Sequence, residues 1–221
     1  MPDFTALQTL QSSLIRKFRN GSVFVSNTPS VTLPTRLTAT TDNKPTALTI
    51  TDWTDLGLLS EDGAQFESET STSDTTTWQQ VEPARSDVVS KVNTLALQAK
   101  ETKRATIELY TGKDLSTLIP ATGGAVVFDD DTTPSFRYAR VLAIGVDDTA
   151  DGPIYLGRAL THARVTSLGG QSINKGDDGL VYDLTFTGYV DDVLKTSQRW
   201  YFEGPGWLAA LSRMGFKPAA A

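Results

Sequence analysis

The chain has 221 residues, with 20 lysines and arginines against 26 aspartates and glutamates, so its formal net charge is −6. Because phosphate neutralisation requires lysine and arginine, this balance argues against a general nucleic-acid binder. Cysteine is absent, which excludes disulfides, thiolate zinc sites and cysteine nucleophiles. The apolar runs fall short of the ~20 residues of a membrane span, and the first residues lack a signal-peptide pattern. We therefore expect a soluble protein, and its length fits either one large β domain or two small ones.

The N-terminal region predicts a helix followed by a strand. Apolar side chains recur at three- and four-residue spacing over residues 4–18, which is typical of one face of a helix. Asp3 is a suitable cap for its start, and Asn20-Gly21 is a suitable stop. The basic residues near that end suit the helix dipole, or alternatively form a docking patch for the carboxylates of a second subunit. Residues 22–26 predict a short strand.

Residues 27–51 predict a loop and then a hairpin. Two prolines within residues 27–34 disfavour a strand there, because proline cannot donate to a ladder. The β-branched residues over 35–51 are interrupted by the turn-forming sequence Asp42-Asn43-Lys44-Pro45, which predicts two strands with a tight connection.

Residues 63–81 differ from their neighbours in composition. Serine, threonine and carboxylates dominate the stretch, and Phe66 is the only large apolar residue before Trp78. Such a segment buries too little apolar surface to form a core element. One interpretation is an extended two-stranded arm, with residues 71–74 near its tip and Trp53 and Trp78 as paired anchors at its base. A structureless loop is the alternative, although loops beyond ~12–15 residues are uncommon unless functional.

The middle of the chain predicts a pair of strands. Apolar and polar side chains alternate over residues 91–100 and again over residues 104–110, and residues 101–103 supply the turn between them. One helical turn is expected over residues 112–118.

The last third of the chain is again rich in predicted strands. Residues 136–146 are apolar on both faces, which indicates a central strand covered on two sides. Residues 158–168 and 180–190 predict two further strands, followed by a strand over 196–202 and a short helix over 207–214. In residues 180–190 large apolar residues alternate with polar ones, so one face should be packed and the other wet. The polar set is Asp183, Thr185 and Thr187.

Candidate catalytic residues are few. His162 is the only histidine, so sites with several imidazoles are excluded and a Ser-His-Asp triad has no partners that can be named. The sequence contains no Walker loop, Rossmann fingerprint or Gly-x-Ser-x-Gly elbow. We expect a structural histidine, and we predict no catalytic residue, no cofactor and no metal.

Four aspartate runs lie at or just beyond the ends of predicted strands. Aspartate there commonly accepts hydrogen bonds from a turning backbone. None of the runs has EF-hand spacing, so a calcium ion is an alternative to turn chemistry rather than the expectation. A glycosidase pair is a further alternative, because its two carboxylates can be far apart in sequence. The runs are Asp129-Asp130-Asp131, Asp147-Asp148, Asp177-Asp178 and Asp191-Asp192.

Several fragments, in this order and spacing, carry a resemblance to a known family. They are residues 13–25, Trp53 to Gly63, Thr94-Leu95-Ala96-Leu97 to Tyr110-Thr111-Gly112, and Val181 to Phe186 followed by Asp191. Together they resemble the major tail tube protein of phages with long, non-contractile tails, particularly phages of actinobacteria.

The resemblance implies a mainly β fold, namely a β-sandwich or half-barrel with a flanking short helix and an extended hairpin arm or loop. It implies that six subunits form a ring, that their sheets join into a continuous inner barrel, and that the rings stack into the tube for genome ejection. The implied partners are further copies of the chain, a tape-measure protein and other tail proteins, while DNA passes through the lumen without specific binding. It implies a non-enzymatic virion protein that is assembled in the host cytoplasm.

The resemblance implies a single tail tube domain over residues 1–221, and three segments match its parts. Residues 1–21 correspond to an N-terminal helix or arm, residues 63–81 to an extended loop between subunits, and residues 196–221 to a C-terminal extension. The residues assigned to the subunit interface are Trp53, Phe66, Glu67, Glu69, Asp74 and Trp78. The residues assigned to the lumen are Asp183, Thr185 and Thr187.

Two other functions remain open. Trp53, Trp78, Trp200 and Trp207 suggest a sugar-stacking face, and hence a β-sandwich module that binds carbohydrate or a cell surface, although large aromatics usually fill cores or protein interfaces. The aspartates suggest a carboxylate hydrolase. A binding module should stay monomeric and bind glycans, a hydrolase should turn over substrate, and a tube protein should form rings and do neither.

Overall fold

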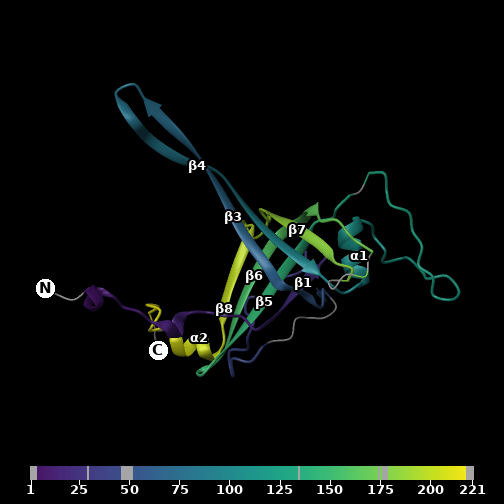
Figure 1. Cartoon of the computed structure of the whole chain (residues 1–221), viewed down its shortest axis with the longest axis horizontal. Coiled ribbons are helices and arrows are strands. Elements are labelled where there is room, and N and C mark those ends of the chain that lie inside the picture. Colours follow the sequence, from purple (N-terminus) through teal and green to yellow (C-terminus); the bar gives the residue numbers. More distant parts are fainter. Residues whose placement is uncertain are drawn as a thin grey trace.

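One antiparallel sheet of eight strands dominates the computed structural model, which describes residues 4–28, 30–45, 52–133, 135–173, 175 and 179–217 (Figure 1). The strand order along the sheet is β2-β1-β5-β6-β7-β4-β3, and β8 pairs with β6. The fold is therefore mainly β, as the sequence predicts. The strands are β1 (Asn20–Ser26), β2 (Thr54–Asp55), β3 (Leu59–Thr77), β4 (Gln80–Ala99), β5 (Ala139–Thr149), β6 (Gly152–Leu168), β7 (Tyr182–Tyr189) and β8 (Gln198–Glu203).

Strands β3 and β4 form a long hairpin whose far half projects from the body (Figure 1). We call residues 67–91 of this hairpin the arm. The arm was predicted over 63–81 with its tip at residues 71–74, and the structure corrects this: both strands are longer, and the tip lies at Trp78. Trp78 is 98% exposed at the tip whereas Trp53 is 6% exposed inside the body, so the prediction of paired anchors at the base is wrong.

The first core lies on one face of the sheet. Leu95, Leu97, Leu184 and Phe186 are at most 3% exposed, and their alternation along β4 and β7 confirms the predicted packed face. Helix α1 (Arg104–Thr111) packs against the same core through Leu109.

A second core lies on the opposite face of β5, β6 and β8, beneath the segment that connects β1 to β2. Glu203 of β8 holds this segment, because it accepts hydrogen bonds from the backbone N–H groups of Leu37 and Thr38, both at 2.9 Å, and from the Thr38 hydroxyl at 2.6 Å. The buried residues of this core are Leu33, Leu37, Trp53, Leu142, Ala159 and Tyr201.

The predicted helix over residues 4–18 is wrong. The structure has two short 3₁₀ turns there, Phe4–Leu7 and Ser12–Leu14, and irregular backbone elsewhere. An amphipathic helix owes most of its stability to packing of its apolar face, and among the described residues most apolar side chains of this segment stay uncovered. Its exposed apolar residues are Phe4, Leu7, Leu10 and Ile15, which are 70–82% exposed. Asp3, the predicted cap, lies outside the described residues.

Residues 104–110 form α1 rather than the predicted second strand. Buried Thr106 and Leu109 stand three residues apart, as do half-buried Ile107 and Tyr110, so the segment satisfies helical spacing as well as alternation. The helix ends at Gly112, which adopts the left-handed conformation with φ of 72°. Residues 113–118 contain a turn but not the predicted helical turn.

The remaining elements agree with the sequence more closely. The predicted strands at 22–26, 136–146, 158–168, 180–190 and 196–202 correspond to β1, β5, β6, β7 and β8. Helix α2 (Pro205–Ala210) begins and ends earlier than the predicted 207–214. The predicted hairpin over 35–51 has one described bridge, Thr38 with Pro45, and residues 46–51 lie outside the described residues. Among the described helices, none is long and apolar enough to cross a membrane.

Candidate assembly surfaces

Four strands present a polar face on the side of the sheet away from the first core. This polar face comprises β3, β4, β7 and the C-terminal part of β6. In its middle row the strand register places Glu67 beside Thr94, Thr94 beside Thr187, and Thr187 beside Arg164. Hydroxyl and charged side chains therefore run across all four strands at this level.

The three residues predicted to face the lumen lie together on β7 within this polar face. Asp183, Thr185 and Thr187 are all half-buried. The Gln98 amide donates to the Asp183 carboxylate at 3.2 Å, and the Thr187 and Thr166 hydroxyls are 2.7 Å apart. Hydrogen bonds between neighbouring strands thus fix the side chains of this face.

The polar face has a free edge on each side. Strand β3 is the last strand of the sheet, and within the described part of the chain it pairs only with β4. On the other side, the pairing of β6 with β5 ends at Ala163, so among the described strands residues 164–168 pair with β7 alone. Because each pairing from β3 to β6 is antiparallel, the two edge strands run in opposite directions.

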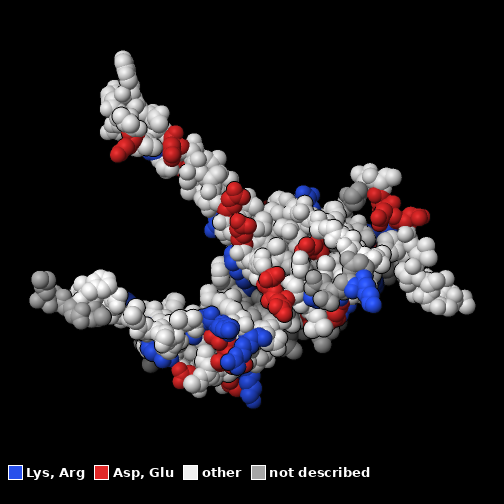
Figure 2. Space-filling model, in the orientation of Figure 1, with Lys and Arg blue, Asp and Glu red and all other residues white. Residues whose placement is uncertain are grey.

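The arm carries most of its charge as carboxylates, visible along its length in Figure 2. Residues 67–91 contain five acidic and two basic residues. The predicted interface residues Glu67, Glu69 and Asp74 all lie exposed on this arm. An acidic, hydroxyl-rich ribbon of this kind resists edge-to-edge pairing between free subunits.

A cation–π sandwich fixes the base of the hairpin. The Arg158 guanidinium lies 4.3 Å from the centre of the Phe66 ring and 4.1 Å from that of Trp200, which joins β3 to β6 and β8. Phe66, another predicted interface residue, is half-buried here within one subunit.

An open groove of about 700 Å³ lies between the start of β3 and the strands β1, β5 and β6. Its apolar lining includes Val23, Leu59, Phe66, Ala143 and Leu156. Its charged lining combines the carboxylates of Asp55, Glu61, Asp62 and Glu101 with the basic side chains of Arg19, Lys103 and Arg158. The groove continues the face that holds the first core, and Phe18 of the same subunit is among its lining residues.

An aromatic band extends from the groove along β8 to the C-terminal region. Phe202 pairs with Leu156 of the groove lining, and Trp200 pairs with Arg158. Ring centres along the band are 5.8, 4.8 and 5.8 Å apart. The band consists of Trp200, Phe202, Trp207 and Phe216, of which Trp200 is 51% and Phe216 is 55% exposed. The sequence places Trp207 at the start of a predicted C-terminal helix, but it contains no pattern that predicts the alignment of these rings.

Comparison with known families identifies the chain. A family model described as phage tail tube protein matches residues 8–206. The chain belongs to the phage tail tube protein family. No curated protein matches it significantly.

The aspartate runs of this tail tube protein serve different purposes where they are described. Asp191 accepts hydrogen bonds from the backbone N–H groups of Val193 and Leu194 and pairs with Arg140 at 2.7 Å. Asp147 lies 3.8 Å from Arg16. No group of three or more histidine, aspartate or glutamate side chains is placed to hold a metal within the described residues, and Asp177-Asp178 lies outside them.

The single histidine of the tail tube protein packs against an aromatic ring. His162 stacks on Tyr138 with ring centres 4.0 Å apart. Burial of Asp191 acts to raise the pKa of its carboxyl. Hydrogen bonds from the Leu194 and Val193 N–H groups, and then the charges of Arg140 and His162, outweigh burial and lower this pKa. The arrangement fits the structural role that the sequence suggests for His162.

Proposed function

We propose that six copies of this tail tube protein close into a ring through the two free edges of the polar face. Strand β3 of one subunit pairs with residues 164–168 of the next, and the polar faces become the inner wall of a continuous barrel. The observation that carries this proposal is the opposite direction of the two edges, because a subunit-to-subunit pair would then be antiparallel like the pairs within the subunit.

Ring closure removes an energetic liability of the subunit. Free strand edges leave backbone N–H and C=O groups without partners and favour aggregation. A barrel removes both edges at once, and a head-to-tail contact generates a ring when its rotation closes. The interfaces are expected to bury on the order of 2,000 Å² or more, as obligate interfaces do.

The composition of the polar face suits a passage for DNA. Asp183, Thr185 and Thr187 line the lumen in this proposal, with Arg164 as a positive group in the same face. Short hydroxyl and acidic side chains make few lasting contacts with phosphates, whereas each basic contact adds salt-dependent affinity. DNA then passes without specific binding.

The arm bridges each subunit to a neighbour in this assembly. Its exposed face carries Glu67, Glu69 and Asp74, and Trp78 stands unsupported at its tip. Stacked rings form the tail tube of a virion, assembled in the host cytoplasm with a tape-measure protein and other tail proteins, and the tube conducts the genome during ejection. Segments 1–21, 63–81 and 196–221 remain the proposed contact segments, with 63–81 extended to the whole arm.

A single residue at the β6 edge tests ring closure. The Gly169 N–H donates to the Asp183 carbonyl, so the N–H of Leu168 points away from β7 toward the free edge, because donors alternate along an antiparallel strand. Leu168→Pro removes that outward donor and spares the pairing with β7. We expect folded subunits that do not form rings in electron micrographs, while the matched control Leu168→Ala assembles. Normal tubes from the proline variant, or unmodified chain that stays monomeric beside its tail partners, would contradict the proposal.

A further inference from the structure

Arg164 is a half-buried cation at the free edge of β6, and it has no carboxylate partner among the described residues. Its guanidinium carbon lies 5.5 Å from the centre of the Tyr138 ring and 5.6 Å from that of Tyr189, and it donates to the Tyr189 hydroxyl at 3.5 Å. Asp191, the buried carboxylate just after β7, is already paired with Arg140 at 2.7 Å. The two rings therefore hold a positive charge that the described subunit does not neutralise.

Strand β3, at the opposite edge of the polar face, has two carboxylates on that face. Glu67 and Glu69 are exposed, and they alternate with half-buried residues that lie on the other face. The register places Glu67 beside Thr94 and Glu69 beside Val92, so no basic side chain stands directly opposite either glutamate. Neither glutamate makes an ion pair within the part of the chain that the structure describes.

The basic residues of the hairpin do not supply the missing partner. Lys91 pairs with Thr70, and because successive side chains alternate between the two faces, it lies on the opposite face from Glu69. Arg85 lies farther along the arm and contacts Asp87 at 2.7 Å. One edge of the polar face thus carries an unpaired cation, and the other edge carries unpaired carboxylates.

We infer that Arg164 of one subunit pairs with Glu67 and Glu69 of the next, and that this contact sets the register in which the ring closes. The inference rests on the proposed function, in which β3 of one subunit lies beside residues 164–168 of its neighbour. Paired strands are about 4.8 Å apart, and opposite charges on neighbouring strands attract. The contact also neutralises one positive charge per subunit in the wall of the lumen.

Barrel geometry explains why two glutamates serve this role. Within one subunit the register places Glu67 level with Arg164. Closing a barrel staggers the register, and the stagger proceeds in steps of two residues because a one-residue slip turns every side chain to the other face. After one such step in either direction, Arg164 stands opposite Glu69 or Gln65. In both cases a glutamate is directly opposite or diagonally adjacent, within reach of a long side chain.

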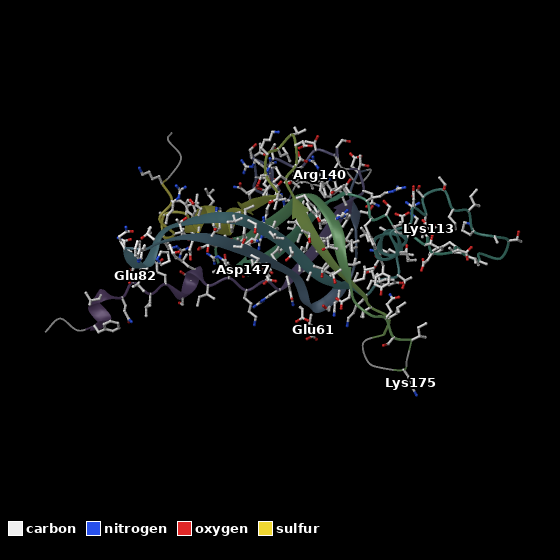
Figure 3. The ribbon with its side chains drawn as sticks, turned by 90° about the horizontal axis from the view of Figure 1, so that it is seen from above. Glu61, Glu82, Lys113, Arg140, Asp147 and Lys175 are labelled. Carbon is white, nitrogen blue, oxygen red and sulfur yellow. The ribbon has the colours of Figure 1, made fainter. Side chains whose placement is uncertain are left out.

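Two other kinds of anion compete for Arg164. Genome phosphates are one, because Arg164 lies on the face proposed for the lumen, but six unpaired arginines per ring would add salt-dependent contacts along the path of the DNA. Other carboxylates of the hairpin are the second kind. Figure 3 places Glu61 on the body and Glu82 at the far end of the arm, away from the level of Arg164. The glutamates on the adjoining edge are therefore the better partners.

Exchange of charge between copies tests the inference. Arg164→Glu and the double variant Glu67→Arg/Glu69→Arg each place like charges at every contact between subunits, so neither should form rings at a concentration at which the unmodified chain assembles. Mixed in equal amounts before assembly, the two should form rings again, because every contact in an alternating ring then joins opposite charges. Electron micrographs detect the rings, and native mass spectrometry should find three copies of each chain per ring.

Controls separate charge from other effects. Arg164→Lys keeps the charge and should assemble. Asp129→Arg/Asp130→Arg makes the same charge change as the β3 variant, on exposed residues outside the sheet, and should also assemble. Circular dichroism of each dispersed chain checks that it is folded. If Arg164→Glu does not fold, the combined variant Glu67→Arg/Glu69→Arg/Arg164→Gln replaces the mixture, and it should recover rings because it removes the contact between like charges.

Three results would overturn the inference. One is normal ring formation by Arg164→Glu, which together with an altered rate of DNA ejection would assign Arg164 to the phosphates. Another is normal ring formation by Glu67→Arg/Glu69→Arg alone. The third is a loss of rings that neither the mixture nor the combined variant restores. All three leave ring closure standing as long as the unmodified chain forms rings, whereas an unmodified chain that forms none would refute both proposals.

Discussion

Replacing Asp191 with asparagine should destabilise the subunit strongly, because it leaves a buried charge without its partner. The Arg140 and Asp191 side chains are 7% and 6% exposed and lie 2.7 Å apart. Loss of one member of a buried ion pair typically costs about 3–5 kcal/mol, while replacing both members by apolar groups is often close to neutral. Single domains are stable by only about 5–15 kcal/mol, so the loss is large.

The matched variants separate the charge from the loop geometry. Arg140→Met alone should also destabilise, and the double variant Arg140→Met/Asp191→Asn should lose less than the sum of the two single losses, because it contains no unpaired charge. Val193 and Leu194 still donate to the asparagine oxygen, so the loop after β7 keeps its turn in both backgrounds.

Urea unfolding of dispersed subunits, followed by tryptophan fluorescence at neutral pH, measures these differences. An unchanged slope with a lower midpoint indicates a change in stability alone. Asp191→Asn within about 0.5 kcal/mol of the unmodified chain, the usual range for surface substitutions, would refute the reasoning. So would strict additivity of the two single losses.

The pH dependence follows from the same contacts. The pKa of Asp191 is lowered in the folded state, because the N–H groups of Leu194 and Val193, with Arg140, outweigh the effect of burial. Its stabilisation is therefore complete above the unfolded pKa of about 3.9 and is lost as the pH falls through the lower folded value. Asp191→Asn should flatten this acid limb, and an unchanged acid limb would contradict the assignment.

Three further predictions follow from the other contacts. Glu203→Gln should lower the free energy of unfolding by about 1.5–3 kcal/mol, the range for hydrogen bonds to charged groups. It should also make stability less sensitive to acid, because hydrogen bonds from Thr38 and Leu37 lower the pKa of Glu203 despite its burial. An unchanged urea midpoint would contradict this prediction. Trp78→Ser should leave the unfolding midpoint unchanged, since the ring is 98% exposed, yet reduce tube yield in micrographs; full yield would exclude a role for the tip. Asp183→Lys should permit assembly but slow DNA ejection, most at low salt, because six basic groups per ring would bind phosphates. If the Asp183→Lys variant ejects DNA at the wild-type rate, as the surface control Thr41→Lys should, then Asp183 does not face the lumen.

The sequence predicted best where one face of a strand is buried. Tyr182, Leu184 and Phe186 alternate with polar residues along β7, and the structure packs them as expected. The prediction was poor where a segment fits both strand alternation and helical spacing, and where no core packs against the segment to select one of the two. Helix α1 is only eight residues long, too short for alternation and helical spacing to differ clearly. The outer half of β4 has no buried face, so its pairing with β3 left no apolar signature.

The assembly surfaces were harder to predict than the fold. The polar residues of β7 were identifiable from alternation, but their neighbours on β3, β4 and β6 depend on register between distant segments. The groove likewise unites residues from five separate stretches of the chain. The aromatic band needed the pairing of β8 with β6, which places Trp200 beside Arg158 and Phe202 beside Leu156.

The two-stranded form of the arm has a mechanical consequence. At ~3.3 Å per residue, the stretch from Glu67 to Thr77 reaches roughly 35 Å from the body. Over this length the described arm is stabilised by hydrogen bonds between its two strands, and no second layer packs against it. Such a ribbon resists stretching, because its length is fixed by covalent bonds and an extended backbone, but it bends and twists easily across its thin direction. A tube whose neighbouring rings are connected by six of these ribbons would bend under load without the rings separating.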